Sequence, residues 1–135
     1  MVMDWNKQNG REMKRFLIIE DNKMMAMILA QLLRQSIQSP QILHAPTLQQ
    51  TYQYLSQYTV DVVFLDLNIE RPLDGIDLLM HIRKIHPTLP VVIVTSDSEI
   101  DTVKRVVALN PTDYLIKPLS LNNLQACLEK CAMLQ

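Results

Sequence analysis

This 135-residue sequence lacks a strong charge of one sign and a long apolar run, and it contains only two cysteines. Its 13 Lys and Arg residues nearly balance 14 Asp and Glu residues, and a net charge of -1 argues against a general binder of nucleic acids or membrane surfaces. No apolar run approaches the roughly 18 residues that a membrane-spanning helix needs. The first 14 residues contain no hydrophobic segment typical of a secretion signal, so we expect a cytoplasmic protein.

The two cysteines, Cys127 and Cys131, are one helical turn apart near the end of the sequence. They could supply two ligands of a zinc site, but zinc takes four ligands. The histidines His44, His81 and His86 are scattered along the chain and form no cluster with them. We therefore predict that both cysteines are small apolar residues on the buried side of a last helix.

Hydrophobic residues make up 48% of the sequence, enough for one core. We expect a flexible N-terminal leader over 1–14 and a single domain over 15–135. Strand-like apolar runs alternate with segments of helical spacing throughout that domain; the runs lie at 16–19, 41–45, 60–67, 90–94 and 113–116. Five strands alternating with five helices predict an α/β fold, with one parallel sheet covered by helices on both faces.

Helix ends and helix faces can also be predicted from the sequence. Asn22 and Ser120 are placed to cap the first and last helices, and Asn110 suits the turn that follows the fourth. Apolar residues at helical spacing predict the buried stripes. In the first helix these are Met24, Met25, Ile28, Leu29, Leu32 and Leu33; in the third, Ile76, Leu79, Met80 and Ile82; and in the fourth, Ile100, Val103, Val106 and Val107.

Polar residues whose side chains can bind a metal ion or take part in a reaction follow four of the five expected strands. The first strand ends in Glu20-Asp21, the third in Asp66, the fourth in Thr95 and the fifth in Lys117. In an open parallel sheet, ligands bind at the carboxyl ends of the strands. Three carboxylates, a hydroxyl and an ammonium are therefore expected to meet at one rim of the sheet.

Such a set is suited to receive a phosphoryl group on a carboxylate. Neighbouring carboxylates repel one another, and Mg2+, which prefers oxygen ligands, relieves that repulsion. A lysine can hold a phosphoryl oxygen, and a threonine hydroxyl can donate to it. Asp66 is the best candidate nucleophile because it stands alone, whereas Glu20 and Asp21 are adjacent and suit metal binding. A carboxylate needs no base to remove a proton before it attacks.

Four segments carry a resemblance to a known family: 16–22, 61–68, 91–96 and 113–118. In this order and on these strands, they resemble the CheY-like receiver domain of two-component response regulators over about 14–133. The resemblance implies a doubly wound, flavodoxin-like sheet of five strands in the order 2-1-3-4-5, with five helices.

The resemblance also implies a magnesium site and a phosphate acceptor. Asp21 would bind Mg2+ directly, Glu20 through water, Asn68 through its backbone carbonyl, and Asp66 would complete the site. Asp66 would accept a phosphoryl group from a sensor histidine kinase or a histidine phosphotransfer protein. The domain would not be an enzyme, since it would at most catalyse its own phosphorylation and dephosphorylation.

Three further residues would form the switch that the resemblance implies. Thr95 and Lys117 would move onto the phosphate, and Tyr114 would turn inward with them. The Lys117-Pro118 bond is often cis in this family. The face formed by the fourth helix, the fifth strand and the fifth helix would then bind a partner or a second copy.

The resemblance extends to the face of the first helix that carries Lys23, Ala26, Met27 and Ala30, which would dock the kinase. We expect no contact of this domain with nucleic acid or membrane. The sequence ends just after the last expected helix, and no output domain is visible in it, so a stand-alone regulator and a piece of a longer protein are both left open.

The sequence departs from the family pattern at two points. The segment from Asp66 to Gly75 is one residue longer than the common spacing, and we expect this to affect the shape of that loop and the lifetime of the phosphate. Residues 110–112, Asn-Pro-Thr, stand where many relatives carry a Gly-Ala turn, and we expect a stiffer turn there.

Three alternative functions can be weighed against these residues. A phosphatase of the haloacid dehalogenase type needs a second Asp two positions after the nucleophile, where this sequence has Asn68. A flavodoxin-like cofactor carrier would bind phosphate after the first strand, where Glu20-Asp21 would repel it. A receiver-like interaction module that works without phosphorylation remains open as the alternative.

Overall fold

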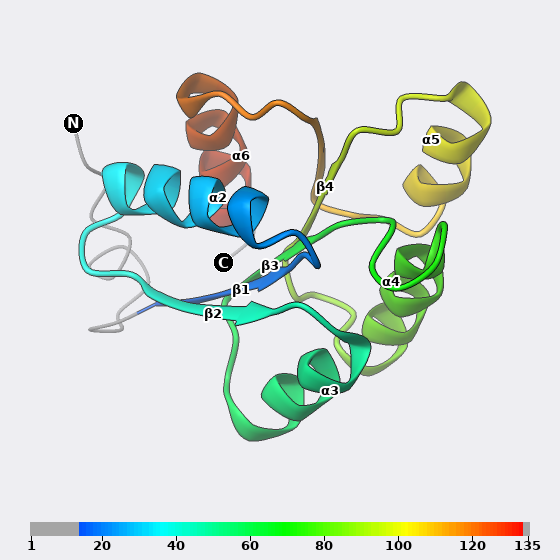
Figure 1. Ribbon diagram of the computed structural model, residues 1–135, viewed down its shortest axis with the longest axis horizontal. Coiled ribbons are helices and arrows are strands. Elements are labelled where there is room, and N and C mark those ends of the chain that lie inside the picture. Colours follow the sequence, from blue (N-terminus) through cyan, green and yellow to red (C-terminus); the bar gives the residue numbers. More distant parts are fainter. Residues whose placement is uncertain (1–13, 134–135) are drawn as a thin grey trace.

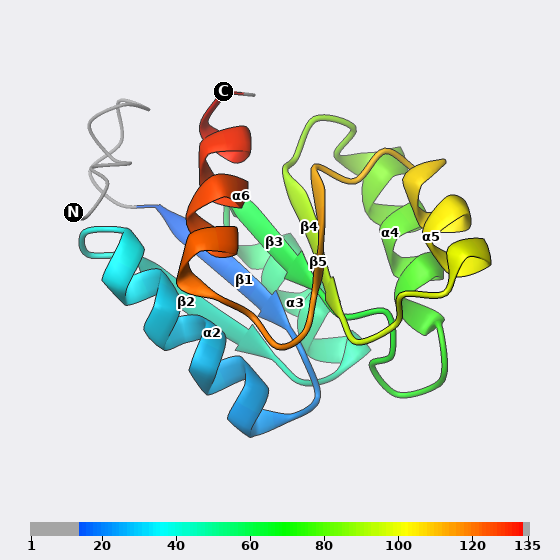
Figure 2. The same cartoon turned by 90° about the horizontal axis from the view of Figure 1, so that it is seen from above.

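In the computed structural model, which describes residues 14–133, the chain forms a five-stranded parallel sheet with helices on both faces (Figures 1 and 2). The strand order is β2-β1-β3-β4-β5, which confirms the predicted fold. The described residues contain the strands β1 (Arg15–Ile19), β2 (Gln41–Ala45), β3 (Val62–Leu65), β4 (Val91–Thr95) and β5 (Asp113–Ile116). They contain the helices α2 (Lys23–Ser36), α3 (Leu48–Gln57), α4 (Asp74–Ile85), α5 (Ile100–Val107) and α6 (Leu121–Met133).

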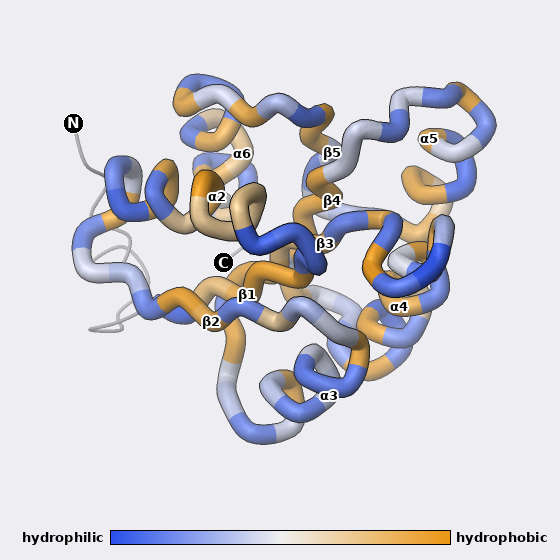
Figure 3. The backbone as a smooth tube through the Cα atoms, in the orientation of Figure 1, coloured by the Kyte–Doolittle hydropathy of each residue, from blue (hydrophilic) through white to orange (hydrophobic). Residues whose placement is uncertain are grey.

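Two hydrophobic cores lie on opposite faces of the sheet. Successive side chains of a strand point to opposite faces, so Phe16 and Ile18 join the core under α2 and α6. Leu17 and Ile19 join the core under α3, α4 and α5. Figure 3 shows the apolar residues concentrated on the central strands, which explains why these strands read as continuous apolar runs.

The helix ends follow the predicted capping residues. The Asn22 side chain accepts a hydrogen bond from the Met25 amide at 3.0 Å, and the Ser120 hydroxyl accepts one from the Asn123 amide at 3.1 Å. Asn110, which follows α5, has φ of 58°, a left-handed conformation that asparagine tolerates better than most residues. Both predicted caps and the predicted turn are therefore confirmed.

The predicted buried stripe of α2 was partly wrong. Met24 is 66% exposed and Ile28 is 39% exposed, whereas Ala26 and Ala30 are buried. The buried residues Ala26, Leu29, Ala30 and Leu33 have the same i, i+3, i+4, i+7 spacing, and the small alanines face the sheet and α6. Ala26 and Ala30 are therefore not part of an exposed docking face.

The predicted buried stripes of α4 and α5 were also partly wrong. Met80 of α4 is 42% exposed, while Ile76, Leu79 and Ile82 are buried as predicted. In α5, Ile100 is 70% exposed and Val107 is 54% exposed. Apolar spacing alone therefore overstated how much of α5 is buried.

The two ends of the described segment bear on two further predictions. Cys127 and Cys131 are fully buried in the core under α6, which confirms the prediction that they lie on the buried side of the last helix.

Residues 1–13 of the predicted leader lie outside the described residues. Lys14 is buried, and its carbonyl accepts a hydrogen bond from the Gln41 amide. Among residues 14–133, no helix is both long enough and apolar enough to cross a membrane.

Candidate functional site

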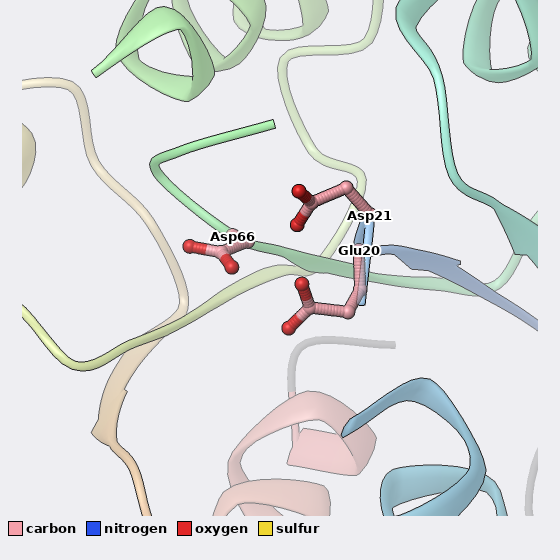
Figure 4. A group of neighbouring side chains, drawn as sticks. All are labelled: Glu20, Asp21 and Asp66. Carbon is pink, nitrogen blue, oxygen red and sulfur yellow. The ribbon is translucent and has the colours of Figure 1, made fainter. Parts of the chain in front are cut away.

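Three carboxylates lie together at the carboxyl ends of β1 and β3 (Figure 4). Ile19 pairs with Leu65 in the parallel register, so the residues that follow them, Glu20 and Asp66, leave the sheet side by side. Glu20, Asp21 and Asp66 each offer one carboxylate oxygen within 4.8 Å of the other two. The structure therefore brings together the acidic residues that the sequence placed at these strand ends.

Lys117 joins this cluster from the end of β5. Its ammonium nitrogen donates to Glu20 Oε1 at 2.5 Å and to Asp66 Oδ2 at 3.0 Å. The Lys117-Pro118 peptide bond is cis, as the family resemblance implied. A residue 97 positions from Glu20 thus completes the site, because parallel strands direct all their carboxyl ends to one rim.

Burial and repulsion between the carboxylates favour the protonated form of Glu20 in this cluster. Glu20 is only 6% exposed, and burial, with a smaller contribution from the Asp66 charge, raises its pKa to about 7 despite the hydrogen bond from Lys117. Burial lowers the pKa of Lys117, but its hydrogen bonds to Glu20 and Asp66 outweigh burial, so its pKa is raised. Lys117 therefore stays charged at neutral pH, while Glu20 holds its proton more tightly than an exposed glutamate.

The donor set fits a hard divalent cation. All three acidic side chains present oxygen ligands, and Mg2+ binds through one or two carboxylates while keeping several waters. Asp21 is exposed and can be reached from solvent, whereas Glu20 and Asp66 are buried. The cluster is thus an acidic pocket compatible with magnesium.

Thr95 and Tyr114 meet at the loop between β4 and α5. The Thr95 side chain is fully buried, and its hydroxyl accepts a hydrogen bond from the Asp97 amide at 3.4 Å. The Tyr114 hydroxyl donates to the Asp97 carbonyl at 2.7 Å, and burial raises the pKa of Tyr114. Both residues that the sequence singled out on this side are therefore connected through one loop residue.

Asn68 lies in the loop between β3 and α4, two residues after Asp66. Its backbone amide donates to Asp66 Oδ1 at 3.1 Å, and its side-chain oxygen accepts from the Leu73 amide at 2.7 Å. Asp66 therefore has a donor on each carboxylate oxygen, Asn68 on one and Lys117 on the other.

Two residues near the site were missed by sequence reasoning. Asp74 accepts three backbone hydrogen bonds from the loop that carries Asn68. His44, at the end of β2, forms a hydrogen bond of 2.7 Å through its Nε2 to the Glu20 carbonyl. The sequence feature that could have pointed to Asp74 is its position just before Gly75 at the start of a helix. For His44, the one such feature is its position near the end of a strand.

The chain matches the family model described as the response regulator receiver domain over residues 16–129. It is 34% identical over 116 residues to the transcriptional regulatory protein CitB of Klebsiella pneumoniae, which covers 86% of this chain and 49% of that protein. It is 37% identical over 81 residues to the transcriptional regulatory protein ZraR of Escherichia coli (strain K12), which covers 60% of this chain and 18% of that protein.

Among solved structures, the fold is similar to a two-component response regulator from Clostridium difficile. The TM-score is 0.80 at 26% identity, with 89% of this chain and 96% of that chain covered. The chain spans about half or less of the length of the two transcriptional regulators that it matches.

Proposed function

Because the chain belongs to the response regulator receiver domain family, we propose that Asp66 accepts a phosphoryl group and that this modification switches the binding of a partner. The observation that carries the proposal is the position of Asp66. Its carboxylate lies beside Glu20 and Asp21 and receives a hydrogen bond from Lys117. Receiver domains are in general not enzymes in themselves, and we propose that this one at most catalyses its own phosphorylation and dephosphorylation.

The acceptor chemistry needs alignment and charge neutralisation rather than a base. An Asp66 oxygen forms the bond to phosphorus while the bond between phosphorus and the donor's leaving group breaks, so no proton leaves the carboxylate. The Lys117 ammonium, which donates to Asp66, would hold an oxygen of the incoming group, and the Asn68 amide would keep the Asp66 carboxylate in one orientation.

We propose that magnesium is the cation of the site. Asp21, Asp66 and the backbone carbonyl of Asn68 would hold it directly, and Glu20 would hold it through water. The ion would neutralise negative charge on the carboxylates and on the phosphoryl oxygens. Ionised Glu20 is needed for this role, so the ion would compete with the proton that burial favours on that side chain.

The proposed switch runs from Asp66 to α5. A phosphoryl group adds about -1.5 to -2 charges and new acceptor oxygens, to which Thr95 and Lys117 would donate. Thr95 and Tyr114 both bond to Asp97, so a movement of Thr95 would be felt by Tyr114 and by the start of α5. Phosphorylation would thereby shift an existing equilibrium of this segment.

The face formed by α5, β5 and α6 is the proposed output surface. Ile100 and Val107 of α5 and Ile116 of β5 are exposed apolar side chains, which suit contact with a partner or a second copy. The domain itself is proposed to contact neither nucleic acid nor membrane.

A sensor histidine kinase or a phosphotransfer protein is the proposed donor, and α2 its docking site. The exposed residues Met24, Met27 and Ile28 form an apolar surface at the end of α2 nearest the carboxylate cluster. This surface borders a groove of about 650 Å³ between α2 and β2, lined also by Arg34 and His44. The proposal places the domain in the cytoplasm with its donor.

Phosphorylation by a small-molecule donor tests the acceptor assignment. Wild-type protein and an Asp66→Asn variant are incubated with acetyl phosphate and Mg2+, and intact mass is measured. The wild type should gain one phosphoryl group and the variant none. Asp77→Asn, which removes the same charge from an exposed position on α4, should behave as the wild type. Uptake by Asp66→Asn would refute the assignment, and no uptake by the wild type would favour the interaction module without phosphorylation.

A further inference from the structure

The loop between β3 and α4 is organised by the side chain of Asp74. One carboxylate oxygen accepts from the Ile69 amide at 2.8 Å. The other accepts from the amides of Glu70 and Arg71 at 2.9 and 3.0 Å. Hydrogen bonds to an ionised acceptor are roughly twice as strong as neutral ones. One carboxylate thus binds three consecutive peptide groups of this loop.

The first of these peptide groups contains the Asn68 carbonyl. A peptide unit is planar and trans, so the Ile69 N–H and the Asn68 C=O point in opposite directions. Because the Ile69 N–H is directed at Asp74, the Asn68 carbonyl must point away from Asp74. The orientation of this carbonyl is therefore set by a side chain six residues further along the chain.

The same hydrogen bond changes the carbonyl as a ligand. An anion that accepts from the N–H of a peptide group polarises that group and increases the negative charge on its oxygen. Outer-shell partners of this kind orient metal ligands and make them more basic. The Asp74 carboxylate and the Asn68 carbonyl are placed to act on each other through one peptide unit.

The same loop contains a residue in an unfavourable backbone conformation. Leu73 has φ of 62°, a left-handed conformation that is unfavourable for a bulky side chain. The bond from its amide to Asn68 and the bonds to the neighbouring Asp74 retain the chain in that conformation.

We infer that Asp74 is a positioning residue, which fixes the orientation of the Asn68 carbonyl and polarises this carbonyl as a ligand before the divalent ion arrives. This inference rests on the proposed function, since it assumes that Asn68 is a ligand. The simpler interpretation is that Asp74 only stabilises the first turn of α4 through its charge. Asp77, which lies in the same first turn and is exposed, provides the matched control.

The test measures magnesium affinity by isothermal titration calorimetry at constant ionic strength. Asp74→Asn should weaken Mg2+ binding about ten-fold, the lower end of the effect of losing an outer-shell partner. Asp77→Asn should change the Mg2+ affinity less than about two-fold. It also removes a charge from the first turn of α4, but the hydrogen bonds described for the amides of residues 69–71 go to Asp74. Equal affinities of the two variants would overturn the inference.

A kinetic measurement separates positioning from loss of the fold. Phosphorylation of Asp74→Asn by acetyl phosphate should require more Mg2+ but reach the wild-type rate at saturation. A rate that stays low at every Mg2+ concentration would contradict a positioning role. Failure of the wild type itself to bind Mg2+ or take up phosphate would instead overturn the proposed function.

The wild-type protein provides a second readout that needs no variant. The amides of residues 69–71 should be protected from hydrogen exchange without Mg2+, because the carboxylate already binds them. Fast exchange that becomes slow only when Mg2+ is added would mean that the ion, and not Asp74, shapes the loop.

Discussion

Helices α4 and α5 follow one another in the chain and cover the same face of the sheet (Figure 2), but they are attached to it differently. α4 has 12 residues and buries five of them, including Leu78, Leu79 and Ile82. α5 has 8 residues and buries only Thr102 and Val106. Their starts differ as well, because the Asp74 side chain accepts three backbone hydrogen bonds from the loop before α4, whereas the Asp97 side chain accepts one, from the Glu99 amide, before α5.

We infer from this difference that the site has a fixed part and a movable part. The carboxylates, Asn68 and the start of α4 are joined by several short hydrogen bonds. On the other side of the site, the hydrogen bonds described for the side chains of Thr95 and Tyr114 both go to Asp97, which precedes α5. Elements that move in a switch come from the regions of low local stability. We therefore expect the ion and phosphate to bind at the fixed part, and α5 to respond.

The largest effect should come from truncating the buried face of α4. Leu79→Ala removes a fully buried side chain and should lower the free energy of unfolding by about 2–5 kcal/mol. Val107→Ala on α5, where the side chain is 54% exposed, should change it by less than about 0.5 kcal/mol. Urea denaturation of both variants measures the two values. Similar losses would remove the basis for treating the two helices differently.

The acidic cluster should make the stability of the metal-free protein depend on pH. The pKa of Glu20 is raised from 4.5 to about 7 in the folded protein, so the folded state binds more protons than the unfolded state between these values. The free energy of unfolding should therefore fall as pH rises from about 5 to 8, by at most about 3 kcal/mol. Glu20→Gln in EDTA should lack this fall. A wild-type protein that gains stability over the same range relative to Glu20→Gln would contradict the assigned shift.

Gly75 tests how tightly α4 is joined to the end of β3, where the proposed acceptor Asp66 lies. A Cβ at this position would lie 2.3 Å from the Asp66 carbonyl oxygen and 2.7 Å from Leu67 Cα, so backbone must move. Gly75→Ala should cost about 1–3 kcal/mol of stability, although alanine normally favours a helix. It should also slow phosphorylation by acetyl phosphate, because the displaced backbone is that of Asp66. A variant as stable and as fast as wild type would show that the junction is not rigid.

The sequence predicted the sheet and the convergence of Glu20, Asp21, Asp66 and Lys117 for a clear physical reason. Buried parallel strands read as continuous apolar runs, and their carboxyl ends must share one rim. The side chains that follow those runs are therefore close in space, although up to 97 residues apart in the chain.

Helix faces and the β3–α4 loop were less accessible to sequence reasoning. In α2, Met24 and Ile28 are more hydrophobic than Ala26 and Ala30, but the small alanines are the residues that pack against the sheet and α6. Close packing depends on the distance between elements, which hydropathy does not encode. The bonds that Asp74 accepts depend likewise on backbone geometry rather than on a spacing pattern.

The smallest effect should come from giving α5 the cap that it lacks. Glu99 has the extended backbone of an N-cap residue, and the first turn of α5 receives no bond from its side chain. Serine is a favoured N-cap residue, so Glu99→Ser should stabilise α5 by about 0.5–1 kcal/mol. Hydrogen exchange of α5 amides should then slow by roughly two- to five-fold, while exchange in α4 stays unchanged. If exchange slowed equally in both helices, α4 and α5 would open together, and phosphorylation could not move α5 independently of the α4 side, where the proposed magnesium site lies.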